Sequence, residues 1–67
     1  MRKLLNEGSE LYLNRCGGLW VVDIFPTFRK DGTPYLVDEC PEPTYHAAYD
    51  SLTAAWADVQ SWRGWEE

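Results

Sequence analysis

Cys16, Cys40 and His46 have the widest chemical range in this sequence, because thiols and imidazoles bind metals and serve as nucleophiles and bases. A structural zinc site needs paired ligands at short spacing, such as two cysteines separated by two residues. Here the two cysteines lie far apart and the chain has a single histidine. We therefore expect no metal and no other cofactor. We expect two buried, reduced thiols and an imidazole at the surface.

Catalytic motifs are also missing from the sequence. It has no nucleophile elbow and no glycine-rich phosphate loop, and Gly17-Gly18 is too short to cradle a phosphate. Carboxylates for acid–base work could come from Asp38, Glu39 and Glu42, but neighbouring acids at a strand end usually point into water. A chain of 67 residues also leaves little room to enclose a substrate. We expect a protein without enzymatic activity.

The charge of the chain is acidic and unevenly distributed. Eleven acidic residues face six basic ones, for a net charge of −5, and residues 34–67 hold one arginine against seven acids. Phosphate backbones are bound mainly through lysine and arginine, so this balance argues against direct nucleic-acid binding. An acidic half suits a basic protein surface, including one built for nucleic acid. A simpler interpretation is that the charge keeps a small domain soluble.

Hydropathy gives no sign of a membrane or of export. The longest strongly apolar run is Leu19–Val22, and only Leu4 and Leu5 follow the basic pair at the N-terminus. Neither a transmembrane helix nor the apolar core of a signal peptide is present. We expect a cytoplasmic protein that makes no membrane contact.

The first two thirds of the chain read as strands and turns, after a polar lead-in over residues 1–8. Residues 9–15 alternate as a short strand, Gly17-Gly18 forms a tight turn, and residues 19–25 are rich in β-branched and aromatic side chains. Asp31-Gly32 is a strong turn signal. We expect residues 35–38 to return from it as the second strand of a hairpin.

The last third permits two interpretations. Helical spacing of apolar residues allows one helix over residues 44–63. Alternatively, residues 45–49 form a fourth strand, and Asp50 or Ser51 caps a helix that begins at Leu52. We favour the second interpretation. Gly64 then fits the first position after the helix, where a left-handed residue is common.

Together these elements predict a single compact α+β domain over residues 1–67. A small antiparallel sheet of three to four strands occupies residues 9–49, and one C-terminal helix over residues 51–63 packs on one of its faces. The expected core contains Leu52, Ala55, Trp56 and Val59 of the helix opposite Trp20, Val22, Ile24 and Leu36 of the sheet. Replacing Trp56 or Ile24 by alanine should then cost about 3–5 kcal/mol.

Aromatic residues exceed what one small core can use, and tryptophan and tyrosine are common at binding hot spots. Trp62 lies at the margin of the helical stripe and Trp65 lies beyond Gly64, where it either anchors a partner or packs back on the helix end. Acids surround this end, and the expected hairpin tip is a second candidate surface. The candidate partner-binding residues are Trp62, Trp65, Asp58, Glu66, Glu67, Asp38, Glu39, Glu42 and Phe28.

The order of three strands followed by a helix that opens with Ser51-Leu52-Thr53-Ala54-Ala55 resembles the partial fold of the HicB antitoxins. The size, the acidity and the lack of a catalytic motif are similar to small phage-encoded inhibitors of host enzymes, including anti-CRISPR proteins. The resemblance covers roughly residues 19–62 and implies a binding role rather than catalysis. No functional residue carries over from either family.

These observations predict a small acidic protein-binding domain. In its most concrete form it is an inhibitor, from a phage or mobile element, that blocks a basic site on a nucleic-acid enzyme. One alternative is an antitoxin-like regulatory module that forms a homodimer through an edge strand or the aromatic helix end. A further alternative is single-stranded nucleic-acid binding, with bases stacked on Trp20, Phe28 and Tyr35 beside Arg29 and Lys30.

Overall fold

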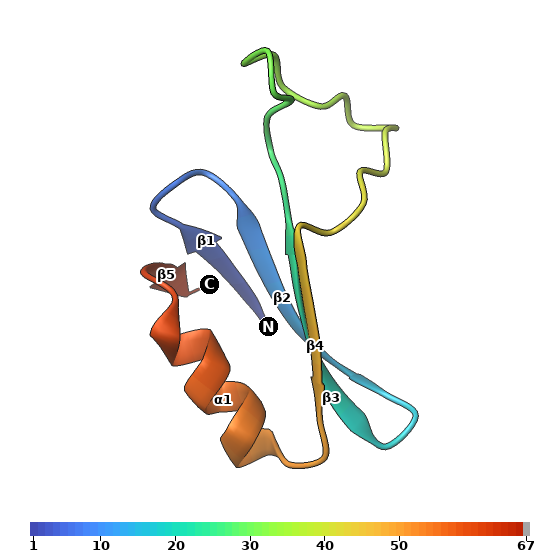
Figure 1. Cartoon of the computed structure of the whole chain (residues 1–67), viewed down its shortest axis with the longest axis vertical. Helices are drawn as coiled ribbons and strands as arrows, with labels where there is room; N and C mark the ends of the chain where they lie inside the picture. The colour runs from blue at the N-terminus through green and yellow to red at the C-terminus, as the bar shows by residue number, and fades with distance from the viewer. Residues whose placement is uncertain (67) are drawn as a thin grey trace.

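Five antiparallel strands form one sheet in the computed structural model, which describes residues 1–66 (Figure 1). The sheet has the spatial order β4-β3-β2-β1-β5. In chain order the elements are β1 (Arg2–Leu5), β2 (Glu10–Cys16), β3 (Leu19–Phe25), β4 (Tyr45–Tyr49), α1 (Leu52–Ser61) and β5 (Gly64–Glu66). The α+β class is confirmed, but the sheet has five strands rather than the three to four expected from the sequence.

The central hairpin of β2 and β3 follows the sequence prediction closely. Both glycines of the turn have positive φ, 57° at Gly17 and 91° at Gly18, which a side chain would disfavour. The strands pair in full register from Glu10 opposite Phe25 to Cys16 opposite Leu19. This hairpin supplies the two longest strands, and the rest of the sheet grows outward from it.

The expected polar lead-in over residues 1–8 is wrong, because residues 2–5 form an inner strand between β2 and β5. Burial alternates along β1, with Lys3 4% exposed and Leu5 3% exposed. The Lys3 ammonium explains how a basic residue can be buried here. It donates to the carbonyl of Val59 at 2.9 Å and to the carbonyl of Trp62, both at the end of α1. A cation at this end also opposes the partial negative charge of the helix terminus.

Residues 26–44 form a long loop, and the predicted returning strand over residues 35–38 is wrong. The turn itself is present, since Gly32 has a φ of 90° and donates to the Arg29 carbonyl at 2.9 Å. The flanking chain makes only one isolated bridge, between Phe28 and Pro34. Proline has no N–H for a ladder, and Pro41 and Pro43 interrupt the chain again. The free edge of β3 is taken by β4 instead.

Residues 45–49 are the strand β4, as favoured from the sequence, and a helix follows at Leu52. The Ser51 hydroxyl accepts a hydrogen bond from the Ala54 amide at 3.2 Å, so Ser51 is the N-cap. The helix ends at Ser61, earlier than the expected limit near Arg63.

Gly64 opens β5 and does not end the helix in a left-handed conformation, so the predicted cap is wrong. A Cβ at this position would lie against the carbonyl of Leu4 and 2.8 Å from the Leu5 Cα. The absence of a side chain therefore lets the C-terminal strand approach β1. Trp65 pairs opposite Leu4 instead of packing back on the helix end.

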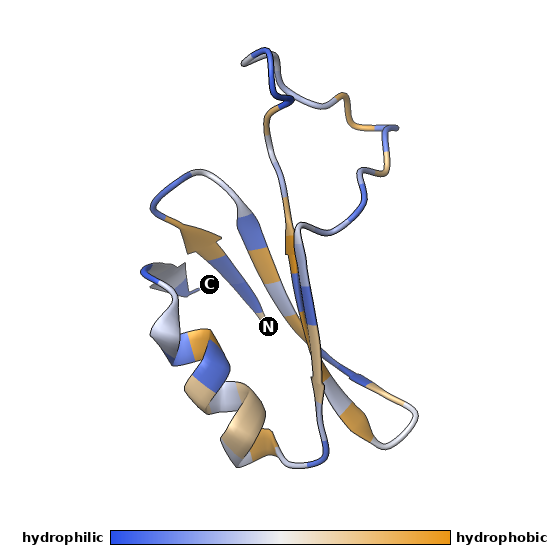
Figure 2. Cartoon of the chain, viewed as in Figure 1, coloured by the Kyte–Doolittle hydropathy of each residue, from blue (hydrophilic) through white to orange (hydrophobic). Residues whose placement is uncertain are grey.

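The core lies between the sheet and α1, and Figure 2 shows apolar and polar residues alternating along the strands that border it. Its members are Leu5, Leu11, Leu13, Val22, Ile24, Ala55 and Val59. The predictions for Val22, Ile24, Ala55 and Val59 are confirmed, and Trp20 packs at the margin. Three other predicted core residues are wrong, because Leu52, Trp56 and Leu36 are 46%, 39% and 64% exposed. Leu52 and Trp56 flank the buried stripe of α1 and line a hollow with Leu13, and Leu36 lies in the loop.

Candidate protein-binding face

The strand register assigns each side chain to one of two faces of the sheet, because directly paired residues of an antiparallel sheet point the same way. Lys3, Leu11 and Ile24 share the face that α1 covers. Within residues 1–66 no helix covers the opposite face, and we call it the open face. One cross-strand row on it runs through Trp65, Leu4, Glu10 and Phe25. A second row runs through Arg2, Tyr12, Asp23 and His46.

Ion pairs and an aromatic contact order the side chains of the open face. Arg2 pairs with Glu10, whose second carboxylate oxygen accepts from the Tyr12 hydroxyl at 3.2 Å. The Tyr12 ring meets the Phe25 ring edge-on, with 5.8 Å between the centroids. The surface is therefore amphipathic, with aromatic rings beside carboxylates.

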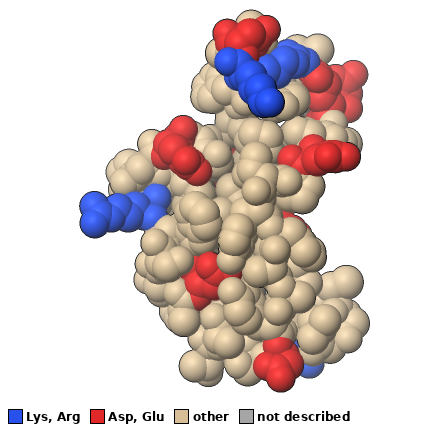
Figure 3. All heavy atoms as spheres, viewed as in Figure 1, with Lys and Arg blue, Asp and Glu red and all other residues tan. Residues whose placement is uncertain are grey.

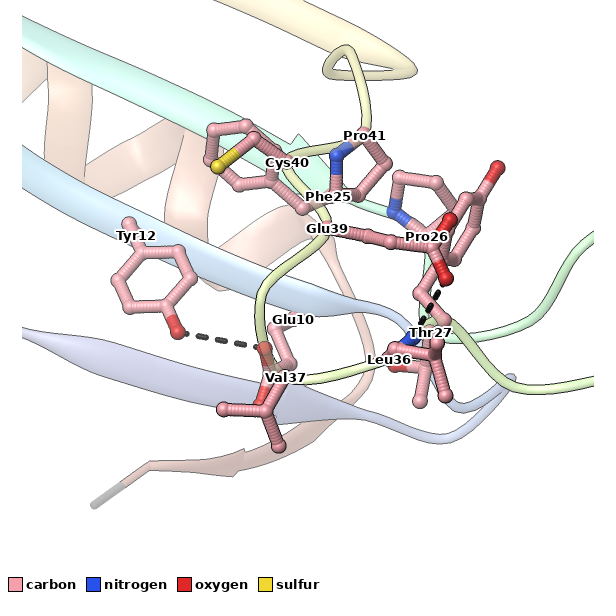
Figure 4. Close-up of a pocket in the computed structure, with 11 residues that line it drawn as sticks. Glu10, Tyr12, Phe25, Pro26, Thr27, Leu36, Val37, Glu39, Cys40 and Pro41 are labelled. Atoms are coloured by element: carbon pink, nitrogen blue, oxygen red, sulfur yellow. Dashed lines mark hydrogen bonds between the residues drawn. The ribbon is translucent and has the colours of Figure 1, made fainter.

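A hollow of about 400 Å³ lies between the open face and the loop (Figure 4). The sheet contributes Glu10, Tyr12 and Phe25, and the loop contributes the facing wall. Most of that wall is apolar or neutral, and it consists of Pro26, Thr27, Tyr35, Leu36, Val37, Glu39, Cys40 and Pro41. Glu10 and Glu39 are the two acidic residues of this lining, and they form ion pairs with Arg2 and Arg29.

Arg29 organises the loop above this hollow. Its guanidinium pairs with Glu39, donates to the Pro34 carbonyl at 3.0 Å and lies 5.1 Å from the centroid of the Tyr35 ring. The Arg29 side chain, together with the Leu36 amide that donates at 2.9 Å, holds the pKa of Glu39 below its usual value. Glu39 is therefore a permanent anion at the rim at neutral pH.

Large apolar side chains are exposed in the loop and on the open face. Val37 is 108% exposed, Leu36 64% and Phe28 53%, and Trp65 of the open face is 66% exposed. Large apolar side chains gathered in this way on one side of a small protein are typical of an interaction site. Figure 3 shows that basic side chains in that view gather mainly at the tip of the loop, next to acids, while separate acids lie along the body below.

The predicted partner-binding residues fall into two groups in the structure. Phe28, Asp38, Glu39 and Glu42 lie in the loop, and the register places Trp65 on the face beneath it. Glu66 belongs to the helix-covered side, since it pairs opposite Lys3 and accepts from the Gln60 amide at 2.7 Å. Glu67 lies outside the described residues.

The side chains of Asp58 and Trp62 make contacts within the fold. The Asp58 carboxylate accepts from the Tyr45 hydroxyl at 2.7 Å, the Tyr49 hydroxyl at 2.8 Å and the Trp62 indole N–H at 3.2 Å. The Trp62 ring also meets the Tyr45 ring edge-on at 5.2 Å. This cluster fastens α1 to β4. Both residues are half-buried, and the contacts of their side chains serve the packing of the helix on the sheet.

This cluster makes the stability of the fold sensitive to alkaline pH. The hydrogen bonds of Tyr45 to Asp58 and Tyr49, together with desolvation, raise the pKa of Tyr45 well above its usual value of 10.0. The folded state therefore holds this proton more tightly than the unfolded state does. Stability from this group is complete below pH 10 and is lost as the pH rises further. Urea unfolding at a series of pH values should show this decline for the wild type and a smaller decline for Tyr45→Phe; equal declines would contradict it.

Tyr12, Leu36 and Val37 were missed as functional candidates by sequence reasoning. Tyr12 carried a usable signal, because it alternates with Leu11 and Leu13 and must point away from the core. Leu36 and Val37 of the loop carried no such signal, since their sequence predicted a strand.

The remaining candidates for chemistry do not form a site. Cys16 and Cys40 are free and exposed, not buried as expected. Within residues 1–66, no three metal-binding side chains come together. The expected stacking platform does not assemble either. Trp20 lies on the helix-covered face, with Arg15 at 5.0 Å from its ring centroid, while Tyr35 lines the hollow on the other side.

In the described part of the chain, no helix has the length and apolar character needed to cross a membrane.

Comparison of the chain with protein-family models, with curated proteins and with solved structures found no significant match to any of them. We therefore infer the function from the geometry and chemistry of the open face and the loop.

Proposed function

We propose that this protein is a non-enzymatic binding domain that docks on a basic protein surface through its open face and loop. The observation that carries the proposal is the hollow between them. Its lining includes the charged side chains of Glu10 and Glu39 and the exposed apolar side chains of Val37 and Leu36. Protein interfaces combine apolar patches with polar and charged side chains, as the lining of this hollow does.

The acidic balance of the chain favours a basic partner. Asp38 and Glu42 are exposed in the same loop, and residues 34–67 hold one basic residue against seven acids. Opposite charges steer association and select against partners of like charge. Basic protein surfaces commonly serve nucleic acids, so binding there would exclude a phosphate backbone. The concrete form of the proposal is therefore an inhibitor of a nucleic-acid enzyme, as also expected from the resemblance to phage-encoded inhibitors.

The experiment is capture of the partner by tagged protein from nuclease-treated lysate of the organism that encodes it, with a matched pair of variants. Trp65→Ala and Trp56→Ala remove the same side chain, one from the open face and one from the exposed helix surface. We expect Trp65→Ala, or Val37→Ser, to weaken binding more than about tenfold, as loss of an interface anchor does. Trp56→Ala should bind as the wild type does. The reverse order would refute the assignment of this face.

Charge is tested separately from shape. Reversing the exposed pair Asp38 and Glu42 to lysine should weaken binding, and raising the salt concentration should weaken the wild type more than this variant. Affinity independent of both changes would remove the basic partner from the proposal. A gel shift of single- or double-stranded probes by the purified chain at low salt would instead establish direct nucleic-acid binding.

A further inference from the structure

β4 ends the sheet on the side opposite β5, and its outer edge has no strand beside it among residues 1–66. Edge strands in soluble proteins are usually protected by proline, lysine, a bulge or shortness. β4 has five residues, Tyr-His-Ala-Ala-Tyr, which pair regularly with β3 and include no proline, lysine or arginine. By contrast, β5 at the other edge has three residues. The outer edge of β4 is therefore open for backbone pairing.

We propose that this edge binds a second copy of the chain, with β4 pairing antiparallel to β4 around a two-fold axis at Ala47. The sequence of the strand is self-complementary in this register. Ala47 meets its own counterpart, and Tyr45 lies opposite the second copy's Tyr49 on the helix-covered face. On the open face, His46 lies opposite the second copy's Ala48. Cross-strand aromatic pairs are favourable, and no like charges meet directly.

The imidazole of β4 and the carboxylate packed above the strand are already paired within each copy. His46 Nδ1 contacts the Asp23 carboxylate on the neighbouring strand, so the imidazole has an acid partner on its own chain. Asp58, above β4, accepts hydrogen bonds from Tyr45 and Tyr49 of its own chain. Pairing two such edges therefore leaves no ionised group of β4 without a counterpart.

The helices leave room for this arrangement. α1 packs against β3, β4 and β2, so its axis lies inward from the edge. Across the proposed junction, the two β3 strands would be three strand spacings apart, about 14 Å. Packed helices need only about 8–10 Å between their axes. The two helices can therefore lie on the same side of the joined sheet without collision.

The two-fold axis of such a pair is perpendicular to the sheet, so the two open faces lie side by side on the other surface. A dimer would thus present two copies of the open face and loop together. The pairing itself rests on β4 alone and does not depend on what the open face binds.

The first experiment is sedimentation equilibrium of the full chain over micromolar to millimolar concentrations. We expect the mass to rise from the 7.8 kDa of one chain toward twice that value. Ala47→Lys would place two lysines against each other at the axis and should weaken association more than about tenfold. Ala57→Lys adds the same charge on the exposed side of α1, away from the edge, and should associate as the wild type does. A wild type that stays monomeric, or a folded Ala47→Lys that still dimerises, would overturn the proposal.

A second measurement keeps the test valid if Ala47→Lys fails to fold. Hydrogen exchange of the wild type should show outward-facing β4 amides protected at high concentration and exchanging more than about tenfold faster on dilution. Amides of β5, at the other edge, should exchange at the same rate at both concentrations. Concentration-dependent protection at β5 or α1, or no change at β4, would locate the contact elsewhere or exclude it.

Discussion

Replacement of Lys3 by methionine is expected to lower the free energy of unfolding by about 2–3 kcal/mol, because hydrogen bonds from a charged donor are worth about 1.5–3 kcal/mol each. The Lys3 ammonium donates to the carbonyls of Val59 and Trp62. Methionine has nearly the same length and fills the same space. The loss would therefore report the hydrogen bonds at the helix end rather than the packing. Val59 keeps one donor, the Trp62 amide at 3.3 Å, which limits the loss.

Lys30→Met is the matched control, since it removes the same charge from an exposed position in the loop. Urea unfolding of both variants should show a change below about 0.5 kcal/mol for Lys30, the usual range for surface substitutions. Equal stability of the Lys3 variant and the wild type would show that β1 holds the helix end by apolar contacts alone. The predicted role of Lys3 would then be wrong.

Ile24→Ala is expected to destabilise the protein by about 3–5 kcal/mol, within the range for a large-to-small change in a core. Ile24 is 1% exposed and lies in β3 between Leu11 and Tyr45, so the cavity would open at the centre of the sheet. A small domain has a correspondingly small margin of stability. We expect a broad or absent thermal transition at room temperature and above.

Leu36→Ala is the control for this change, because the sequence placed Leu36 in the same core and the structure leaves it 64% exposed. Its thermal unfolding should match that of the wild type. If Leu36→Ala were as damaging as Ile24→Ala, the loop would be part of the core and the hollow beneath it would be filled. Trp56→Ala should also cost less than the sequence suggested, because Trp56 is 39% exposed.

Local sequence patterns predict the elements that are determined by neighbouring residues in the chain. β3 is evident from its β-branched and aromatic residues, the β2–β3 turn from two glycines, and the helix start from Ser51. Local patterns do not predict the burial of Lys3, because a basic residue near a chain terminus is usually exposed to solvent. Its hydrogen-bond acceptors lie at a helix end more than fifty residues away in the sequence. The prediction for Gly64 is wrong for a related reason. A glycine after a helix can end the helix in a left-handed conformation or allow another strand to come close, and only the approach of β1 decides between the two.

The candidate site is even less accessible from sequence, because it depends on which strands become neighbours. Alternation predicts that Tyr12 points away from Leu11, but it does not show that Leu4 lies beside both Glu10 and Trp65. The loop is harder still. The sequence of residues 35–38 suits a strand, but these residues have no strand to pair with because β4 occupies the edge of β3.

The most direct test of the proposed binding face is an amide footprint of the isotopically labelled chain in complex with its captured partner. We expect shifts or protection along the open face and loop, at Tyr12, Phe25, Val37 and Trp65, with α1 unchanged. Changes confined to the exposed helix surface at Leu52 and Trp56, with the open face unaffected, would contradict the proposal and place the binding surface on the other side of the sheet.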